Sequence, residues 1–102
     1  MSLKKQYLKS KPMCKVTFKL TKEEAKSADS VKLLGDFNSW DKSSEPMKKL
    51  KNGGFTATLN LDKGNEYQFR YLLDDKNWEN DWKADQYVPS ALAYEDNSVV
   101  SV

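Results

Sequence analysis

The sequence contains no histidine and only one cysteine, and these absences exclude most of the chemistry of small enzymes. Without histidine there is no Ser-His-Asp or Cys-His nucleophile of the usual kind and no imidazole ligand for a metal ion. The single cysteine, Cys14, cannot form an internal disulfide or build a thiolate zinc site, and it suits a reducing compartment. We therefore expect a binding function rather than catalysis, with no metal ion and no cofactor.

Long apolar runs are also missing from the sequence. The longest uninterrupted run is only a few residues, too short to span a bilayer, and the beginning of the sequence lacks the apolar stretch of a secretory signal. From these absences we expect a cytoplasmic protein with no membrane partner.

Aromatic residues, in contrast, are plentiful: 102 residues include three Trp, five Tyr and four Phe. They offset a mean hydropathy of −0.82, because aromatic side chains bury large areas and are scarce in disordered chains. The length suits a single hydrophobic core. We predict a partly ordered N-terminal arm over residues 1–12, ending at Pro12, and one domain over residues 13–102.

Charge is distributed unevenly along the chain. Residues 1–51 carry 13 Lys against 6 acidic residues (+7), residues 52–102 carry 4 basic against 9 acidic residues (−5), and the two halves sum to +2. Lysines on exposed strand edges prevent association between sheets, and this role is favoured over a nucleic-acid footprint. We expect no nucleic-acid partner.

Apolar residues recur with a period of two, which is typical of half-buried β-strands. The clearest case is residues 14–20, where every second residue is apolar. Turn-forming residues separate further expected strands at 31–37, 46–50, 55–61, 66–73 and 97–102, and residues 75–87 are expected to form a long loop with small extended pieces. Seven to eight short strands without helical periodicity predict an all-β protein, an antiparallel β-sandwich of immunoglobulin-like type.

Two tryptophans stand in polar loops instead of at alternating strand positions. Trp40 follows a turn-forming segment and Trp78 lies between Asn77 and Glu79. Burial in the core is the ordinary expectation for Trp, but a flat indole also suits the C–H face of a pyranose ring. In residues 66–73 the alternation directs Arg70 away from the core.

Five motifs in a fixed order resemble the family-48 carbohydrate-binding modules. They are Gly-Asp-Phe-Asn-Ser-Trp at 35–40, Pro-Met at 46–47, Tyr-Gln-Phe-Arg-Tyr in the strand that ends before Asp74, the following Trp78, and Asn-Ser-Val-Val-Ser-Val at 97–102. This early-set family includes the N-terminal domains of isoamylase and glycogen-branching enzymes and the glycogen-binding domain of the AMP-activated kinase β subunit. The resemblance covers about residues 14–102.

The resemblance implies a site for α-1,4/α-1,6-glucan on one face of the sandwich. It implies that Trp40 and Trp78 stack on glucose rings and that Arg70 and Asn97 hydrogen-bond the sugar hydroxyls. The expected function is non-catalytic binding of glycogen, a starch-like polymer or a maltooligosaccharide by a stand-alone module. The alternative is a protein-interaction domain that docks to an enzyme of glycogen metabolism without binding sugar.

The sequence departs from the family pattern at three places. Asp75 replaces a common Gly and one extra residue precedes Trp78, which predicts a displaced indole. Asp81-Trp82 replaces the familiar Asp-Pro, so that Trp82 either fills the space of the proline, which we favour, or forms another sugar platform. The loop over residues 91–96 lacks the family pattern, and no glucan contact is transferred to it.

The acidic residues near these motifs lie in turns, where carboxylates remain solvated and ionised and cannot act as proton donors. We therefore expect no glycosidase acid or nucleophile among Asp36, Asp41, Asp74, Asp75, Glu79 and Asp81.

Overall fold

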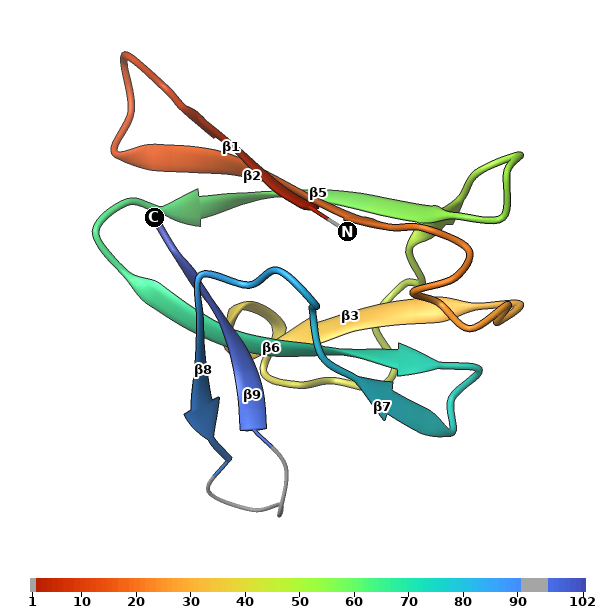
Figure 1. Cartoon of the computed structure of the whole chain (residues 1–102). Helices are drawn as coiled ribbons and strands as arrows, with labels where there is room; N and C mark the ends of the chain where they lie inside the picture. The colour runs from red at the N-terminus through yellow and green to blue at the C-terminus, as the bar shows by residue number, and fades with distance from the viewer. Residues whose placement is uncertain (1, 91–95) are drawn as a thin grey trace.

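The computed structural model describes residues 2–90 and 96–102, which form nine antiparallel β-strands in two sheets (Figure 1). The predicted all-β sandwich is thereby confirmed. Within this described part of the chain, no helix is long and apolar enough to cross a membrane. Most of the loop for which no glucan contact was transferred, residues 91–95, lies outside the described residues.

The first sheet has the strand order β1-β2-β5-β4. Its strands are β1 (Ser2–Tyr7), β2 (Met13–Leu20), β5 (Phe55–Asp62) and β4 (Lys48–Lys49). Strand β4 is only two residues long and pairs with the beginning of β5, so the rest of that edge of β5 has no strand partner in the described structure.

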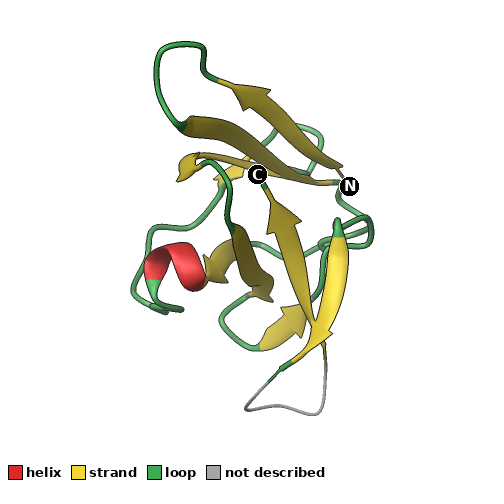
Figure 2. Cartoon of the chain, turned by 90° about the vertical axis from the view of Figure 1, so that its left-hand side faces the viewer, coloured by secondary structure: helices red, strands yellow, loops and turns green. Residues whose placement is uncertain are grey.

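The second sheet has the order β3-β6-β9-β8, and β7 also pairs with β6. Its strands are β3 (Val31–Gly35), β6 (Glu66–Leu73), β7 (Asn77–Glu79), β8 (Gln86–Pro89) and β9 (Asp96–Ser101). A one-turn 3-10 helix, η1 (Asp36–Asn38), follows β3 directly and lies at one side of the molecule in Figure 2.

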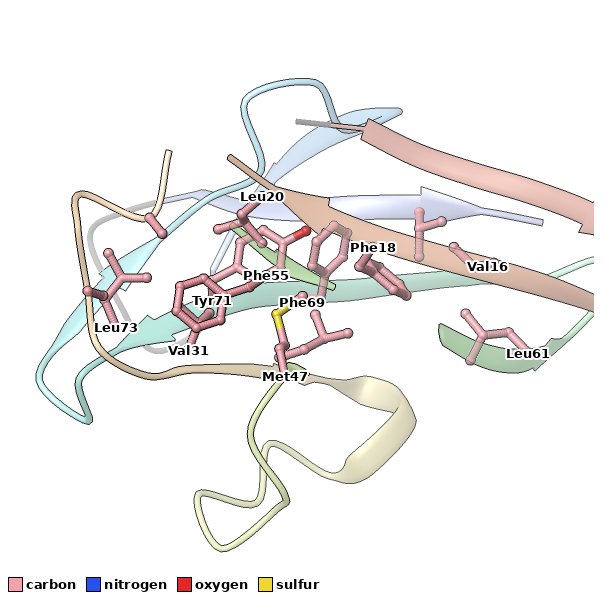
Figure 3. Close-up of a cluster of buried hydrophobic side chains, with 14 of the residues drawn as sticks. Val16, Phe18, Leu20, Val31, Met47, Phe55, Leu61, Phe69, Tyr71 and Leu73 are labelled. Atoms are coloured by element: carbon pink, nitrogen blue, oxygen red, sulfur yellow. The ribbon is translucent and has the colours of Figure 1, made fainter. Parts of the chain in front are cut away.

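The core lies between the two sheets and is formed by the side chains that the period of two directs inward (Figure 3). Phe18 of β2 packs edge-on against Phe69 of β6, with ring centroids 5.2 Å apart, and Phe69 packs in the same way against Tyr71 at 5.7 Å. These three rings are fully buried. Aromatic pairs of this kind add to the stabilisation from buried area, which explains how a polar sequence supports one core.

Strand β1 is the main difference from the sequence prediction. Residues 2–7, expected in a partly ordered arm, pair residue by residue with β2, and Leu3 packs against the core opposite Phe18. Pro12 lies in the turn between the two strands, where its missing N–H disturbs no ladder. The expected strand at 31–37 ends at Gly35 because the chain turns into η1.

Asp81 is a buried carboxyl, which corrects the expectation that it is a solvated turn residue. Its Oδ2 accepts a hydrogen bond from the Tyr71 hydroxyl (2.8 Å), and its Oδ1 accepts one from the Lys83 backbone N–H (2.8 Å). Burial raises the pKa of Asp81 and raises that of Tyr71 well above its usual value. The neighbouring Trp82 is 53% exposed, and the expectation that it fills the space of the family's proline stays a prediction.

Replacing Asp81 by Asn is expected to flatten the pH dependence of stability. Because its pKa is raised in the native state, the stability that Asp81 contributes is fully present below its unfolded-state pKa and is lost as the pH rises through the native-state value. The loss is about 1.4 kcal/mol for each unit by which the pKa is raised.

Urea unfolding of wild type and Asp81→Asn between about pH 4 and about pH 7 measures this effect. Wild type should lose stability relative to the variant as the pH rises. Tyr71→Phe, which removes the hydroxyl donor to the carboxylate, should steepen the loss. A difference between wild type and Asp81→Asn that stays constant with pH would contradict the assignment.

Candidate functional site

The turn after β3 begins with a close contact that requires glycine. A Cβ on Gly35 would lie 2.5 Å from the carbonyl oxygen of Gln68 and 2.8 Å from Cβ of Phe69, both on β6. Neither the backbone nor the buried Phe69 can move away cheaply. The first residue of the Gly-Asp-Phe-Asn-Ser-Trp motif therefore lets β3 end against the central strand of the sheet.

Phe37 and Asn38 fix the turn from two sides. The Phe37 ring reaches into the core and lies 5.8 Å from the ring of Phe18 and 6.5 Å from that of Phe69, between centroids. The Asn38 side chain accepts a hydrogen bond from the Gly35 N–H (3.0 Å) and donates one to the Leu33 carbonyl (2.9 Å). The Asn38 side-chain amide thus holds the turn against the end of β3.

The backbone of Trp40 is held in a conformation that non-glycine residues rarely adopt. Ser39 and Trp40 have φ angles of 57° and 56°, both in the left-handed region. The Trp40 N–H donates to the Gly35 carbonyl (3.0 Å), and the indole Nε1–H donates to Oδ1 of Asp36 (3.0 Å). The second oxygen of Asp36 accepts the backbone N–H of Gln68 (2.9 Å). Strained residues of this kind persist only where surrounding contacts determine them, and they cluster at functional sites.

Trp78 comes to the same face from strand β7. It pairs with Leu72 of β6, so both side chains point to the outer face of the second sheet. The extra residue lies in a left-handed turn before β7, where Asp74 and Asp75 have φ angles of 52° and 57°. Asp74 holds this turn by accepting the backbone N–H groups of residues 29 and 30 at 2.9 and 3.0 Å.

The structure brings Trp40, Trp78 and Arg70 together in one cluster. The indole centroids are 6.3 Å apart and the ring planes are inclined by 59°. The Arg70 guanidinium carbon lies 5.0 Å from the Trp78 centroid and 6.0 Å from that of Trp40, and Arg70 is only 9% exposed. Both indoles are half-buried, so they form an inclined pair that shields the guanidinium and not two fully open platforms.

Lys32 on β3 links the two segments that carry the tryptophans. Its ammonium group donates to the carbonyl of Lys42, two residues after Trp40, at 2.6 Å, and it forms an ion pair with Asp75 at 3.1 Å. Lys42 in turn places its own ammonium group 5.7 Å from the Trp78 ring centroid. These contacts fix the two loops relative to each other.

The indoles stand over a second apolar layer on the outer face of the sheet. Leu34, Leu72 and Val99 are buried although their strand positions direct them away from the core between the sheets. Leu34 pairs with Arg70 across the strands, and Leu72 pairs with Trp78. The second sheet is therefore covered on both faces, which gives the tryptophans a firm base.

Asn97 lies on the same face beside Gln68. Continuing the β6–β9 register by one residue places Asn97 opposite Arg70. The Asn97 side-chain amide donates to Oε1 of Gln68 (3.0 Å), and within the described structure its Oδ1 has no hydrogen-bond partner. A buried acceptor of this kind can receive a hydroxyl from a ligand.

Four residues of this cluster were not predicted as site residues: Lys32, Asp36, Lys42 and Gln68. Gln68 could have been found, because it stands two residues before Arg70 and shares its face. Asp36 follows Gly35 directly in the motif, yet nothing in the sequence shows that its carboxylate reaches the indole four residues later.

Comparison with known proteins gives two findings. The family model described as carbohydrate-binding module 48 (isoamylase N-terminal domain) matches residues 12–88. A 1,4-alpha-glucan branching enzyme, GlgB, of Aquifex aeolicus (strain VF5) is 39% identical over 66 residues, which are 62% of this chain and 10% of that enzyme. The chain thus spans about a tenth of the length of this relative. Because the family model matches most of the chain, the protein belongs to the carbohydrate-binding module 48 family.

Proposed function

We propose that the chain binds α-1,4-glucan chains, as in glycogen or starch-like polymers, on the outer face of its second sheet. The observation that carries this proposal is the inclined pair of Trp40 and Trp78 over Arg70. Membership of the carbohydrate-binding family and similarity to a protein named as a glucan branching enzyme support the same ligand class.

The inclination of the two indoles suits a bent polymer. The α-1,4 linkage turns successive glucose rings relative to one another, so two stacking surfaces for neighbouring sugars need not be coplanar. Ring planes inclined by 59° offer each sugar its own apolar surface. Arg70 contacts both indoles and stabilises this arrangement through cation–π interactions.

Polar groups around the indoles supply the hydrogen bonds. The Oδ1 of Asn97 is an acceptor for a sugar hydroxyl, and Gln68 and Lys42 border the same face. An open face of this kind desolvates little surface and leaves part of each sugar in water. A dissociation constant between about micromolar and about millimolar follows.

The carboxylates near the site have structural roles and do not support hydrolysis. Asp36 binds the indole of Trp40, Asp74 binds two backbone N–H groups, and Asp75 and Glu79 form ion pairs with lysines. Hydrogen bonds from Ser43 hold the pKa of Asp41 below its usual value, so this carboxyl stays ionised. We therefore propose that the chain binds glucan without cleaving it.

Burial raises the pKa of Asp81, and a raised pKa is the property of a glycosidase proton donor. Its carboxyl bonds to the Tyr71 hydroxyl inside the sandwich, on the opposite face of the second sheet from the indoles. A sugar stacked on Trp40 or Trp78 is therefore out of its reach.

A second candidate function is docking to an enzyme of glycogen metabolism. The observation that favours it is a hollow of about 330 Å³ beside the unpaired edge of β5. Apolar side chains contribute to its lining, among them Phe37, Pro46, Met47 and Leu59. Apolar surface outside a ligand site is typical of protein contacts.

Trp40→Ala is expected to weaken glycogen binding about tenfold or more, because it removes a stacking surface. Trp78→Ala should have a similar effect, whereas the control Trp82→Ala should change binding less than about twofold. Co-sedimentation with glycogen measures all three variants. Equal loss in all three, or full retention by Trp40→Ala, would contradict the proposed site.

Arg70→Ala is expected to reduce glycogen retention in affinity electrophoresis, since it removes both hydrogen-bond donors and the support of the two indoles. Because α-glucans are neutral, wild-type retention should change little between about 50 mM and about 500 mM salt. The assigned role is wrong if Arg70→Ala is retained like wild type or if wild-type retention collapses at high salt.

Purified protein is expected to release no reducing ends from glycogen, amylopectin or maltoheptaose during prolonged incubation. Release proportional to protein concentration, and abolished by Ala at one of the six acidic positions named above, would show catalysis after all.

A further inference from the structure

We infer that Asp36 is the positioning residue of the glucan site: its carboxylate fixes the plane of the Trp40 indole before the sugar arrives. This inference rests on the proposed glucan binding. It assigns Asp36 no contact with the sugar, so it differs from the roles of Trp40, Trp78, Arg70 and Asn97.

The two carboxylate oxygens of Asp36 serve different parts of the structure. Oδ1 accepts the indole Nε1–H of Trp40 at 3.0 Å, and Oδ2 accepts the backbone N–H of Gln68 at 2.9 Å. Gln68 belongs to β6, the strand that pairs with β3, β7 and β9. The carboxylate therefore ties the half-buried loop indole to the backbone of the strand that pairs with three others.

The other contacts of the Trp40 indole do not define its orientation as closely. Trp78 and Arg70 contact it through an inclined ring pair and a cation–π interaction, both of which tolerate rotation. A hydrogen bond to a charged acceptor depends on direction and is stronger than a neutral one. Losing it would free an indole that the ligand must then order at the cost of affinity.

Asparagine cannot replace this carboxylate. Its side chain has one acceptor oxygen and one NH₂ donor, whereas the site presents two N–H donors. In Asp36→Asn, one N–H of the site must therefore face the NH₂ group. The variant keeps the size of the side chain but cannot accept both the Trp40 indole N–H and the Gln68 backbone N–H on separate oxygens.

A double-mutant cycle on maltoheptaose binding tests the inference. The variants are Asp36→Asn, Trp40→Phe and the pair, and Phe keeps an aromatic ring but has no N–H. Asp36→Asn should weaken binding about five- to tenfold in the wild-type background and less than about twofold in the Trp40→Phe background, as measured by isothermal titration calorimetry. The matched control is Asp41→Asn, an exposed carboxyl of the same loop that bonds Ser43 and should leave affinity unchanged.

A second measurement reports on the indole without any ligand. In ¹H–¹⁵N spectra the Trp40 indole N–H should shift in Asp36→Asn and exchange with solvent faster, while the Trp78 indole N–H changes little. A structural role in folding alone would move backbone signals throughout the sheet instead.

The outcomes separate the two proposals. If wild type does not bind maltoheptaose or glycogen, the proposed function fails, whatever Asp36 does to the indole. If wild type binds and Asp36→Asn has no effect, or weakens binding equally in both backgrounds, the positioning role is overturned. Equal weakening would show that Asp36 contacts the sugar or holds the loop as a whole.

Discussion

The approach of Gly35 to β6 is the contact on which the proposed glucan-binding face depends. With no Cβ at this position, β3 ends directly against Gln68 and Phe69, and the chain can turn at once into η1. That turn directs the Phe37 ring into the core and brings the Asp36 carboxylate within reach of β6. Any side chain at position 35 would push the turn outward and separate Asp36 from both of its donors. The residues of the motif therefore act together. Gly35 allows the close approach to β6, the Phe37 ring anchors the turn in the core, and the side chains of Asp36 and Asn38 fix the turn by hydrogen bonds.

The second sheet differs from an ordinary solvated sheet because it is covered on both faces. Tyr71 and Phe69 pack into the sandwich, while Leu72 on the same strand is buried on the outer face, paired with Trp78 of β7. Burial on the outer face gives the indoles an apolar base and excludes water around Arg70. Low local polarity strengthens the cation–π contacts that hold the pair of rings. The indoles and Arg70 thus lie on a small second apolar cluster, and the indoles remain partly exposed to solvent.

Alternation in the sequence was enough to predict β2, β3, β5, β6 and β9 and the direction of Arg70, because a period of two determines which face a side chain takes. It could not predict the inclined indole pair, since this depends on the left-handed backbone at Ser39 and Trp40. The burial of Asp81 could not be predicted from the sequence for a related reason. It depends on a hydrogen bond from the Tyr71 hydroxyl, ten residues earlier, which alternation does not indicate. Strand β1 was not predicted because it has few apolar residues, and these stabilise a strand only when it pairs with β2.

The acidic residues around the indole pair act through the backbone. Asp36 and Asp74 each accept backbone N–H groups in the turns that shape this face, whereas Asp81 lies on the other side of the sheet. The carboxylates of Asp36 and Asp74 stabilise turns whose residues adopt unfavourable backbone angles. A carboxylate that accepts these N–H groups can reach a glycosidic oxygen only by releasing the turn it holds. The contacts that hold the indole pair in place therefore compete with any role of these two carboxylates in proton transfer.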